Sequence, residues 1–391
     1  MRRYILDAME LVIAAETARL SRVERRRQIK GKLTREDLVP PARSPWRKVW
    51  EARNDAAFLV TMAITVELFE ELLGLFAPRF EAYSTHRADV NPRGKPRLGR
   101  RLVQAHDALA LVLHWLGSAC EMVQLQQIFA MTPTVCSRYL AYGRRVLLSI
   151  LATYPAAAVI WPSEDLLREY CARIDKQHPL VRNAFGFVDG MRVPIMTSGD
   201  PEIENATYNG WTASHCVSNI FVFGPDGLIL FAVLNAPGSW HDAQVARSLF
   251  EKLDTLPPWY TLLADSAFPS HNVHLQVPFK EGAALPADEE ERQFQLSSNN
   301  AIIAARQAAE WGMRSLEGTF GRLKVPLSVD SVHRSVTLNL VMRLHQLRVR
   351  RIGISQIRSV YYPPIHVDEV GERLFKDIIR SDRLQKFYFQ N

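Results

Sequence analysis

The chain has 391 residues, of which 47% are hydrophobic and 23% charged, a balance that excludes global disorder and allows two or three domains with a sizeable core. The formal net charge is +7, and a basic excess of this kind favours a polyanionic partner such as nucleic acid. The four cysteines include no CxxC pair, which argues against a zinc ribbon and fits a reducing compartment. We expect no signal peptide and no membrane span.

The N-terminal region, residues 1–86, is predicted to be basic and helical. Arginine and lysine side chains cluster over residues 22–32, and the prolines within 36–48 indicate a linker before helical periodicity resumes at about residue 50. The basic cluster is either a solvated helix face, or a nuclear localisation signal or DNA-backbone contact. If the protein is eukaryotic, we expect it in the nucleus.

Residues 87–158 are predicted to form a helical domain of helix-turn-helix character, after a basic arm at 87–101. Helices are expected at 109–116, 122–130 and about 134–154, with Pro133 at the first position of the third. Arg138, Arg144 and Arg145 are expected to face outward from this third helix. They either contact DNA or form the charged face of a three-helix packing unit, and the sequence leaves both interpretations open.

The hydrophobic period changes to two at about residue 183. Strands are predicted at 184–188, 220–223, 228–234 and 260–264, and helices at 242–253 and 297–323. The order of three strands, helix, strand and helix predicts an α/β fold with a ribonuclease-H-like core, a mixed sheet with flanking helices, over residues 159–332. In such a core the first three strands pair antiparallel, the fourth adds in parallel, and residues at the ends of the first and fourth lie side by side. A helix at 334–350 and an irregular tail form the last segment, 333–391.

Carboxylates occupy positions in this region that are suited to metal binding. Asp189 and Asp265 follow the first and fourth predicted strands, each before a small residue that lets the chain turn and a phosphate approach. Glu310 and Glu317 lie on the later helix, about 10.5 Å apart along its axis, so one metal site does not easily take both. Singly, a strand-end aspartate is ordinarily a turn residue. Together, these carboxylates predict a site for two hard divalent ions such as Mg²⁺ that cleaves phosphodiester bonds.

Other polar residues near these carboxylates each have two interpretations. His241 and Asp242 either cap a helix or support the metal site by orienting water or phosphate. Arg306 and Arg314 either pair with the two glutamates or contact DNA phosphates bidentately. Four more basic residues are predicted DNA contacts rather than catalysts: Arg192, Lys280, Arg322 and Lys324.

Several short motifs, taken in order, resemble the PIF/Harbinger group of DDE transposases, to which the Harbinger-derived nucleases belong. The matching pieces are DGMRVP at 189–194, YNG at 208–210, PGSWHD at 237–242, ADSAFP at 264–269 and FGRLK at 320–324. Leu344 and His345 resemble the start of a Leu-His-Asn motif in which Gln346 replaces the asparagine. The resemblance is close over about half of the chain, and the set in this order is much more specific than any one piece.

The resemblance implies a DDE endonuclease that uses Mg²⁺ or Mn²⁺ to cleave DNA at transposon ends and to transfer the strand to target DNA. It places the first two catalytic acids on Asp189 and Asp265. For the third, two registers compete. Asn299, Arg306 and Glu310 match the first half of the family's helix pattern, an Asn, an Arg and the catalytic Glu, whereas the FG and LK pairs that follow Glu317 match its second half and place Glu317 ahead of Glu310. A homodimer or larger assembly on paired DNA ends is implied, and a separate DNA-binding accessory protein is left open.

Two other functions remain open from the sequence. One is a domesticated, transposase-derived DNA-binding protein or scaffold that has lost cleavage. The other is a ribonuclease or structure-specific nuclease on the same fold.

Overall fold

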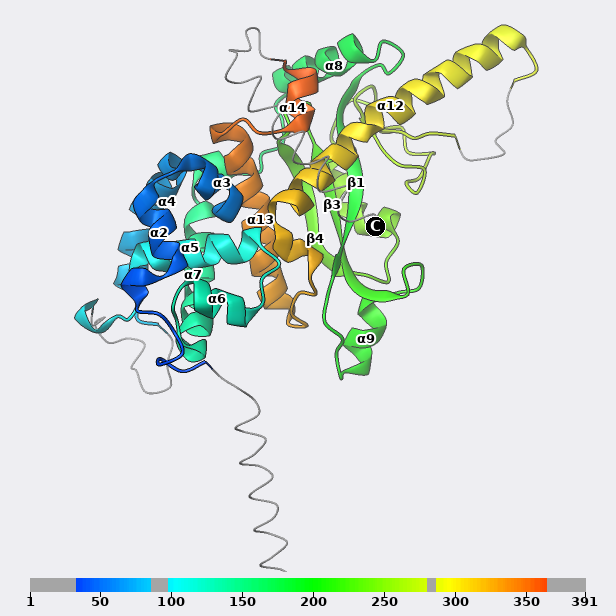
Figure 1. Cartoon of the computed structure of the whole chain (residues 1–391). Coiled ribbons are helices and arrows are strands. Elements are labelled where there is room, and N and C mark those ends of the chain that lie inside the picture. The colour runs from blue at the N-terminus through cyan, green and yellow to red at the C-terminus, as the bar shows by residue number, and fades with distance from the viewer. Residues whose placement is uncertain (1–32, 86–97, 280–285, 364–391) are drawn as a thin grey trace, which may run out of the picture.

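The computed structural model describes residues 33–85, 98–279 and 286–363. The basic segment at 1–32, most of the predicted arm at 87–101, Lys280 and the tail beyond 363 lie outside these ranges. A helical half and a half built on a mixed sheet lie next to each other, with helix α13 between them (Figure 1). No helix within the described ranges has the length and apolar character needed to cross a membrane.

The N-terminal half is built from helices that begin at polar caps. The side chains of Ser44, Asn54 and Thr65 accept hydrogen bonds from backbone N–H groups in the first turns of successive helices. The three helices predicted at 109–116, 122–130 and 134–154 are present as α5, α6 and α7. The elements of this half are η1 (Pro41–Arg43), α2 (Pro45–Ala52), α3 (Asp55–Met62), α4 (Val66–Ala82), η2 (Leu98–Arg100), α5 (Ala105–Gly117), α6 (Met122–Ile128), α7 (Pro133–Leu151) and η3 (Pro155–Ala157).

Six strands form one mixed sheet within the described residues. Strand β3 pairs antiparallel with β1 and β4, and β5 joins the other edge of β1 in parallel, followed by β6 in parallel. The pairing directions expected for the first four predicted strands are therefore observed. The strands are β1 (Ala184–Pro194), β2 (Tyr208–Asn209), β3 (Ser214–Phe223), β4 (Ile229–Pro237), β5 (Thr261–Leu263) and β6 (Leu275–Gln276), and the short β2 pairs with the start of β3.

The first strand is longer than predicted. It was expected to end at Val188, but β1 continues through Asp189 to Pro194, because its second half pairs with β3 as far as Cys216. Asp189 therefore lies in the middle of a strand rather than at its end. Side chains alternate along a strand, so Phe187, Asp189 and Met191 point to one face of the sheet, and Gly190 points to the other.

Helices cover both faces of this sheet. Val188 belongs to the apolar cluster beneath α8, α10 and α11, whereas Phe187 and Met191 belong to the cluster that includes α12 and α13. Asp189 therefore faces the side covered by α12. The helices are α8 (Glu164–Gln177), α9 (Pro201–Thr207), α10 (Asp242–Val245), α11 (Arg247–Leu253), α12 (Glu289–Thr319), η4 (Gly321–Lys324), α13 (Ser331–Arg351) and α14 (Gln356–Tyr361).

Helix α12 packs close to the sheet through small residues. Ala305, Ala308 and Ala309 are buried, and a Cβ atom added at Gly312 would lie 2.6 Å from the buried ring of Phe223. The helix starts at Glu289, before the predicted residue 297, because the side chain of the preceding Asp288 caps it. Its close approach brings the polar face of α12 to the centre of the sheet.

The Leu-His-Gln segment of α13 holds the β3–β4 hairpin. The Gln346 amide accepts a hydrogen bond from the backbone N–H of Ile229 and donates to its carbonyl oxygen, both at 2.8 Å. His345 Nε2 lies 3.1 Å from the carbonyl oxygen of Gly227, and burial lowers the pKa of this histidine to about 4. The neutral imidazole and the amide thus hold α13 against the hairpin, and Gln346 makes both backbone hydrogen bonds of Ile229 on the edge strand β4.

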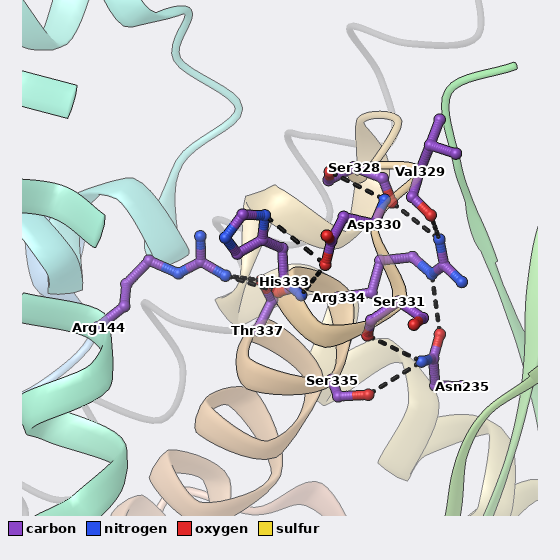
Figure 2. Close-up of polar contacts among 10 residues, drawn as sticks. All are labelled: Arg144, Asn235, Ser328, Val329, Asp330, Ser331, His333, Arg334, Ser335 and Thr337. Carbon is purple, nitrogen blue, oxygen red and sulfur yellow. Dashed lines mark hydrogen bonds and ion pairs between the residues drawn. The ribbon is translucent and has the colours of Figure 1, made fainter. Parts of the chain in front are cut away.

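The start of α13 ties the sheet to the helical half (Figure 2). Asp330 caps the helix by accepting a hydrogen bond from the backbone N–H of His333 at 2.8 Å. Arg334 Nε donates to Asn235 Oδ1 on β4 at 2.8 Å, and Asn235 Nδ2 donates to Ser335 Oγ at 2.9 Å. From the opposite side, Arg144 of α7 donates to the carbonyl oxygen of His333 at 2.7 Å. The N-terminal end of α13 therefore joins β4 to α7.

Arg144 does not face outward, as had been expected from the sequence. Its guanidinium contacts α13 and also stacks on the ring of Trp115, with Cζ 4.5 Å from the ring centroid. Arg322 stacks on the same ring at 4.6 Å and donates to the carbonyl oxygens of Trp115 and Cys120. Burial lowers the pKa of Arg144 to about 10, which still leaves it charged at neutral pH. These two arginines bind protein rather than solvent in this structure, in contrast to their predicted role as DNA contacts.

Replacing Arg144 should therefore destabilise the fold. Arg144→Met keeps the apolar stem but removes the charged hydrogen bonds to the His333 carbonyl oxygen and to the part-buried Thr337 hydroxyl, so we expect a loss of about 1–3 kcal/mol in the free energy of unfolding. The matched control is Arg145→Met, at an exposed position one residue along α7, with an expected change within about 0.5 kcal/mol. Urea unfolding measures both. Equal effects, or weaker DNA binding by Arg144→Met at unchanged stability, would contradict the assignment.

Candidate active site

The register between two parallel strands places Asp189 next to Asp265. Phe187 of β1 pairs with Leu263 of β5, and each aspartate lies two residues further along its chain. Strand β5 ends at Leu263, whereas β1 continues, so the Asp265 segment leaves the sheet beside the middle of β1. The two carboxylates predicted from the sequence thus reach the same place from different elements.

Each of these aspartates is held by the residue that follows it. Asp189 Oδ1 accepts a hydrogen bond from the backbone N–H of Gly190 at 2.8 Å. Asp265 Oδ1 accepts from the backbone N–H of Ser266 at 2.6 Å, and the Ser266 hydroxyl lies 3.3 Å away. The same local arrangement therefore fixes one oxygen of each carboxylate.

A third aspartate packs on the other face of β1. A Cβ atom added at Gly190 would lie 3.0 Å from Asp242 Oδ1, so a larger residue here would force this carboxylate to shift. His241 occupies the N-cap position of α10 but makes no side-chain capping bond, and Asp242 is the first residue of the helix. Asp242 thus adds negative charge next to the Asp189–Asp265 pair.

Burial and the repulsion between neighbouring carboxylates raise the pKa values of two aspartates in the site. Burial raises the pKa of Asp189 to about 6, the negative charges of Asp265 and Asp242 add to this rise, and the Gly190 N–H and the Arg306 guanidinium oppose it. The pKa of Asp242 is also raised by burial, against the positive charge of Arg192. A buried carboxyl with a raised pKa among other carboxylates is characteristic of functional sites.

The two candidate glutamates differ in their relation to these aspartates. Arg306 Nη2 lies 3.2 Å from Glu310 Oε1, and Arg306 Nη1 lies 4.0 Å from Asp265 Oδ2. Glu310 therefore shares a guanidinium partner with Asp265, whereas Glu317 lies about two turns further along α12. The geometry favours Glu310 as the third acid, opposite to the order that the motif match suggested. The four-residue spacing between Arg306 and Glu310 was the sequence signal for this contact.

The donor set suits a hard divalent cation, although the side chains do not yet converge on one. Carboxylate oxygens are the ligands that Mg²⁺ prefers, and Asp189, Asp265 and Glu310 supply them from three elements. Within the described ranges, no three His, Cys, Asp or Glu side chains meet closely enough to hold a metal ion. In this structure the Arg306 guanidinium lies between Asp265 and Glu310.

The remaining predicted residues are dispersed over the surface and the interior. Arg192 is exposed beside Asp242, and Arg314 is exposed on α12 with Nη2 3.6 Å from Glu310 Oε2. Arg145 and Lys324 are exposed, and Arg138 is half-buried. The structure does not bring these basic residues into one cluster with the carboxylates, apart from Arg306, Arg314 and Arg192.

The segment that carries the site matches a known family of nuclease domains. Residues 188–346 match the family model of the DDE superfamily endonuclease, a segment that runs from β1 into α13 and includes Asp189, Asp265 and both glutamates. No curated protein and no solved structure matches the chain. This part of the chain is therefore similar to a transposase-like nuclease domain.

Replacing the buried carboxyl should stabilise the metal-free protein at neutral pH. Because folding raises the pKa of Asp189 from 3.8 to about 6, ionisation costs stability as pH rises through this interval, and the full cost is present above pH 7. The shift corresponds to at most about 3 kcal/mol, reduced by partial exposure to solvent. Asn can still accept the hydrogen bond from Gly190, so Asp189→Asn should gain roughly 1–3 kcal/mol at pH 7.5 and little at pH 4.

The measurement is urea unfolding in EDTA at both pH values. Asp165→Asn on α8, which removes the same charge from a fully exposed position, is the control. An Asp189→Asn variant that is no more stable than the parent at pH 7.5 would contradict this electrostatic description of the site.

Proposed function

We propose that the chain is a DDE-type DNA endonuclease that acts as a transposase, cutting DNA at transposon ends and joining the 3′-hydroxyl strand to target DNA. The observation that carries the proposal is the juxtaposition of Asp189 and Asp265 with Arg306 and Glu310, inside the segment that matches the DDE superfamily endonuclease model. The strand order and pairing directions support a ribonuclease-H-like core around this site. The motifs quoted above favour the PIF/Harbinger subtype.

In this proposal Asp189, Asp265 and Glu310 hold two Mg²⁺ or Mn²⁺ ions. When bound, such ions activate the attacking hydroxyl or water and stabilise the leaving oxygen. The backbone N–H groups of Gly190 and Ser266 keep the two aspartates oriented. Asp242 supports the site from the opposite face of β1 through its contact with Gly190.

DNA would be held mainly through its phosphates. The exposed Arg145, Arg192, Arg314 and Lys324, together with basic residues outside the described ranges, supply positive charge for this purpose. Binding of this kind weakens steeply with salt because it releases counterions from DNA. A homodimer on paired ends, an accessory DNA-binding protein and a nuclear location complete the proposal and follow from the motif resemblance alone.

One observation favours a second candidate, a transposase-derived protein that binds DNA without cutting it. This observation is the Arg306 guanidinium, which lies between Asp265 and Glu310. A protein that had lost cleavage could retain this arrangement. Metal-dependent cleavage separates the two candidates.

The test is cleavage of plasmid DNA in Mg²⁺ or Mn²⁺ by the full chain and four variants. Asp189→Asn, Asp265→Asn and Glu310→Gln should each lower the rate roughly 10²–10³-fold or more, because each removes charge stabilisation from the transition state. Glu317→Gln, two turns away on the same helix, is the matched control and should stay within about tenfold of the parent.

Circular dichroism and filter binding to DNA confirm that each variant folds and binds. Cleavage that survives Asp189→Asn would contradict the metal-site proposal. Cleavage lost in Glu317→Gln but not in Glu310→Gln would identify Glu317, not Glu310, as the third metal ligand. DNA binding without cleavage by the unmodified chain would favour the second candidate. Hydrolysis of an RNA–DNA hybrid alone would point to a ribonuclease.

A further inference from the structure

Arg306 lies at the centre of the carboxylate group rather than on the surface of α12. Its side chain is only 20% exposed, and its two terminal nitrogens face two different elements. Nη2 lies 3.2 Å from Glu310 Oε1 on the same helix, and Nη1 lies 4.0 Å from Asp265 Oδ2 on the segment after β5. Its charge also acts on Asp189 across the site.

A neighbouring arginine shows that this position is not simply that of a helix-surface ion pair. Arg314 also lies four residues from Glu310, with Nη2 3.6 Å from Oε2, but its side chain is 63% exposed and this ion pair stays within its own helix. Exposed pairs of this spacing contribute little to stability, because solvent screens the two charges. Arg306 differs because it also bridges from α12 to the segment that carries Asp265.

Charge balance explains why a cation is held here. Asp189, Asp242 and Asp265 act on one another electrostatically, and like charges this close destabilise the folded state unless a positive group compensates them. The guanidinium supplies that charge in the absence of a metal ion. It does so by facing Asp265 Oδ2 and Glu310 Oε1, which are oxygens of two of the proposed metal ligands.

We propose that Arg306 is a built-in counter-cation of the metal-free site, which divalent ions must displace from Asp265 and Glu310 when they bind. The inference rests on the proposed function, because it takes these carboxylates as metal ligands. Arg306 therefore lowers the affinity of the free protein for metal and keeps the carboxylates together until metal arrives. Once displaced, its guanidinium is free to pair with a DNA phosphate, so metal and DNA binding should favour each other.

The test measures Mn²⁺ affinity without DNA, by isothermal titration calorimetry on the full chain. Arg306→Gln should bind Mn²⁺ at least about tenfold more tightly than the parent, because a competing positive charge at about 4 Å is removed. Arg314→Gln is the matched control: it has the same spacing to Glu310, but its side chain is 63% exposed and its charge is screened by solvent, so its affinity should stay within about threefold of the parent. An Arg306→Gln affinity that is unchanged or weaker would overturn the inference.

A second measurement uses the unmodified chain, so it does not depend on how the variant folds. Phenylglyoxal modifies accessible arginines, and mass spectrometry of peptides gives the rate at each one. Mn²⁺ should accelerate modification of Arg306 at least about threefold and leave that of Arg168, an exposed arginine on α8, unchanged. Unchanged or slower modification of Arg306 in Mn²⁺ would overturn the inference.

The outcomes also separate this inference from the proposed function. If the parent binds Mn²⁺ and Asp189→Asn abolishes that binding, but neither Arg306 measurement changes as expected, only the inference fails. If neither the parent nor Arg306→Gln binds Mn²⁺ at millimolar concentration, the proposed function and the inference fail together.

Discussion

The parallel pairing of β5 with β1 is the contact on which the candidate site depends. It sets Leu263 against Phe187, and because both chains rise by the same amount per residue, Asp265 is carried to the side of Asp189. A register shift of one residue would turn one of the two carboxylates to the opposite face of the sheet. The close packing of α12, which requires glycine at position 312, then brings Arg306 and Glu310 to the same place.

This arrangement concentrates negative charge at a cost to stability. Burial and the neighbouring aspartates raise the pKa of Asp189, so its ionised form opposes folding at neutral pH. Glycine at position 190 allows a further carboxylate, Asp242, to approach rather than relieving the repulsion. Sites arranged for function commonly trade stability in this way. The Arg306 guanidinium on α12 offsets part of the cost.

Contacts outside the site join the segments next to it to the helical half. Arg144 and Arg322 stack on Trp115 and donate to backbone carbonyls, so the end of the α12–η4 segment is fixed to the helical half. The start of α13 joins the same half to β4 through Asn235 and Arg334 (Figure 2). The helical region is therefore packed onto the sheet-containing half.

Local patterns predicted much of this structure. Helices α5 to α7, the β3–β4 hairpin, the parallel addition of β5 and the pairing of Asp189 with Asp265 all follow from hydrophobic period, turn residues and strand order. The full length of β3 was missed, because Ser218 and Asn219 read as polar although both are buried in the sheet. The extension of β1 beyond Asp189 was missed for a related reason, since it depends on pairing with that hidden part of β3.

Contacts between distant parts of the chain were the least predictable. The inward direction of Arg144 depends on Trp115 and on α13, about 190 residues later in the chain. The preference for Glu317 rested on the FG and LK pairs that follow it. In the structure these residues pack η4 against the turn after α5, where a Cβ at Gly321 would lie 3.0 Å from Ala119 N. The FG and LK pairs therefore serve a packing contact in this structure. Glu310 is the glutamate that shares the Arg306 guanidinium with Asp265.

The central claim is that Asp189, Asp265 and Glu310 form one divalent-metal site. The most direct measurement replaces Mg²⁺ by Fe²⁺ and maps, by mass spectrometry, where hydroxyl radicals generated at the bound ion cut the backbone. A single site of this composition predicts cuts clustered around residues 189, 265 and 310, which Mg²⁺ in excess suppresses and Asp189→Asn abolishes. Cuts around residue 317 in place of 310, or cuts scattered over the chain and insensitive to Mg²⁺, would contradict it.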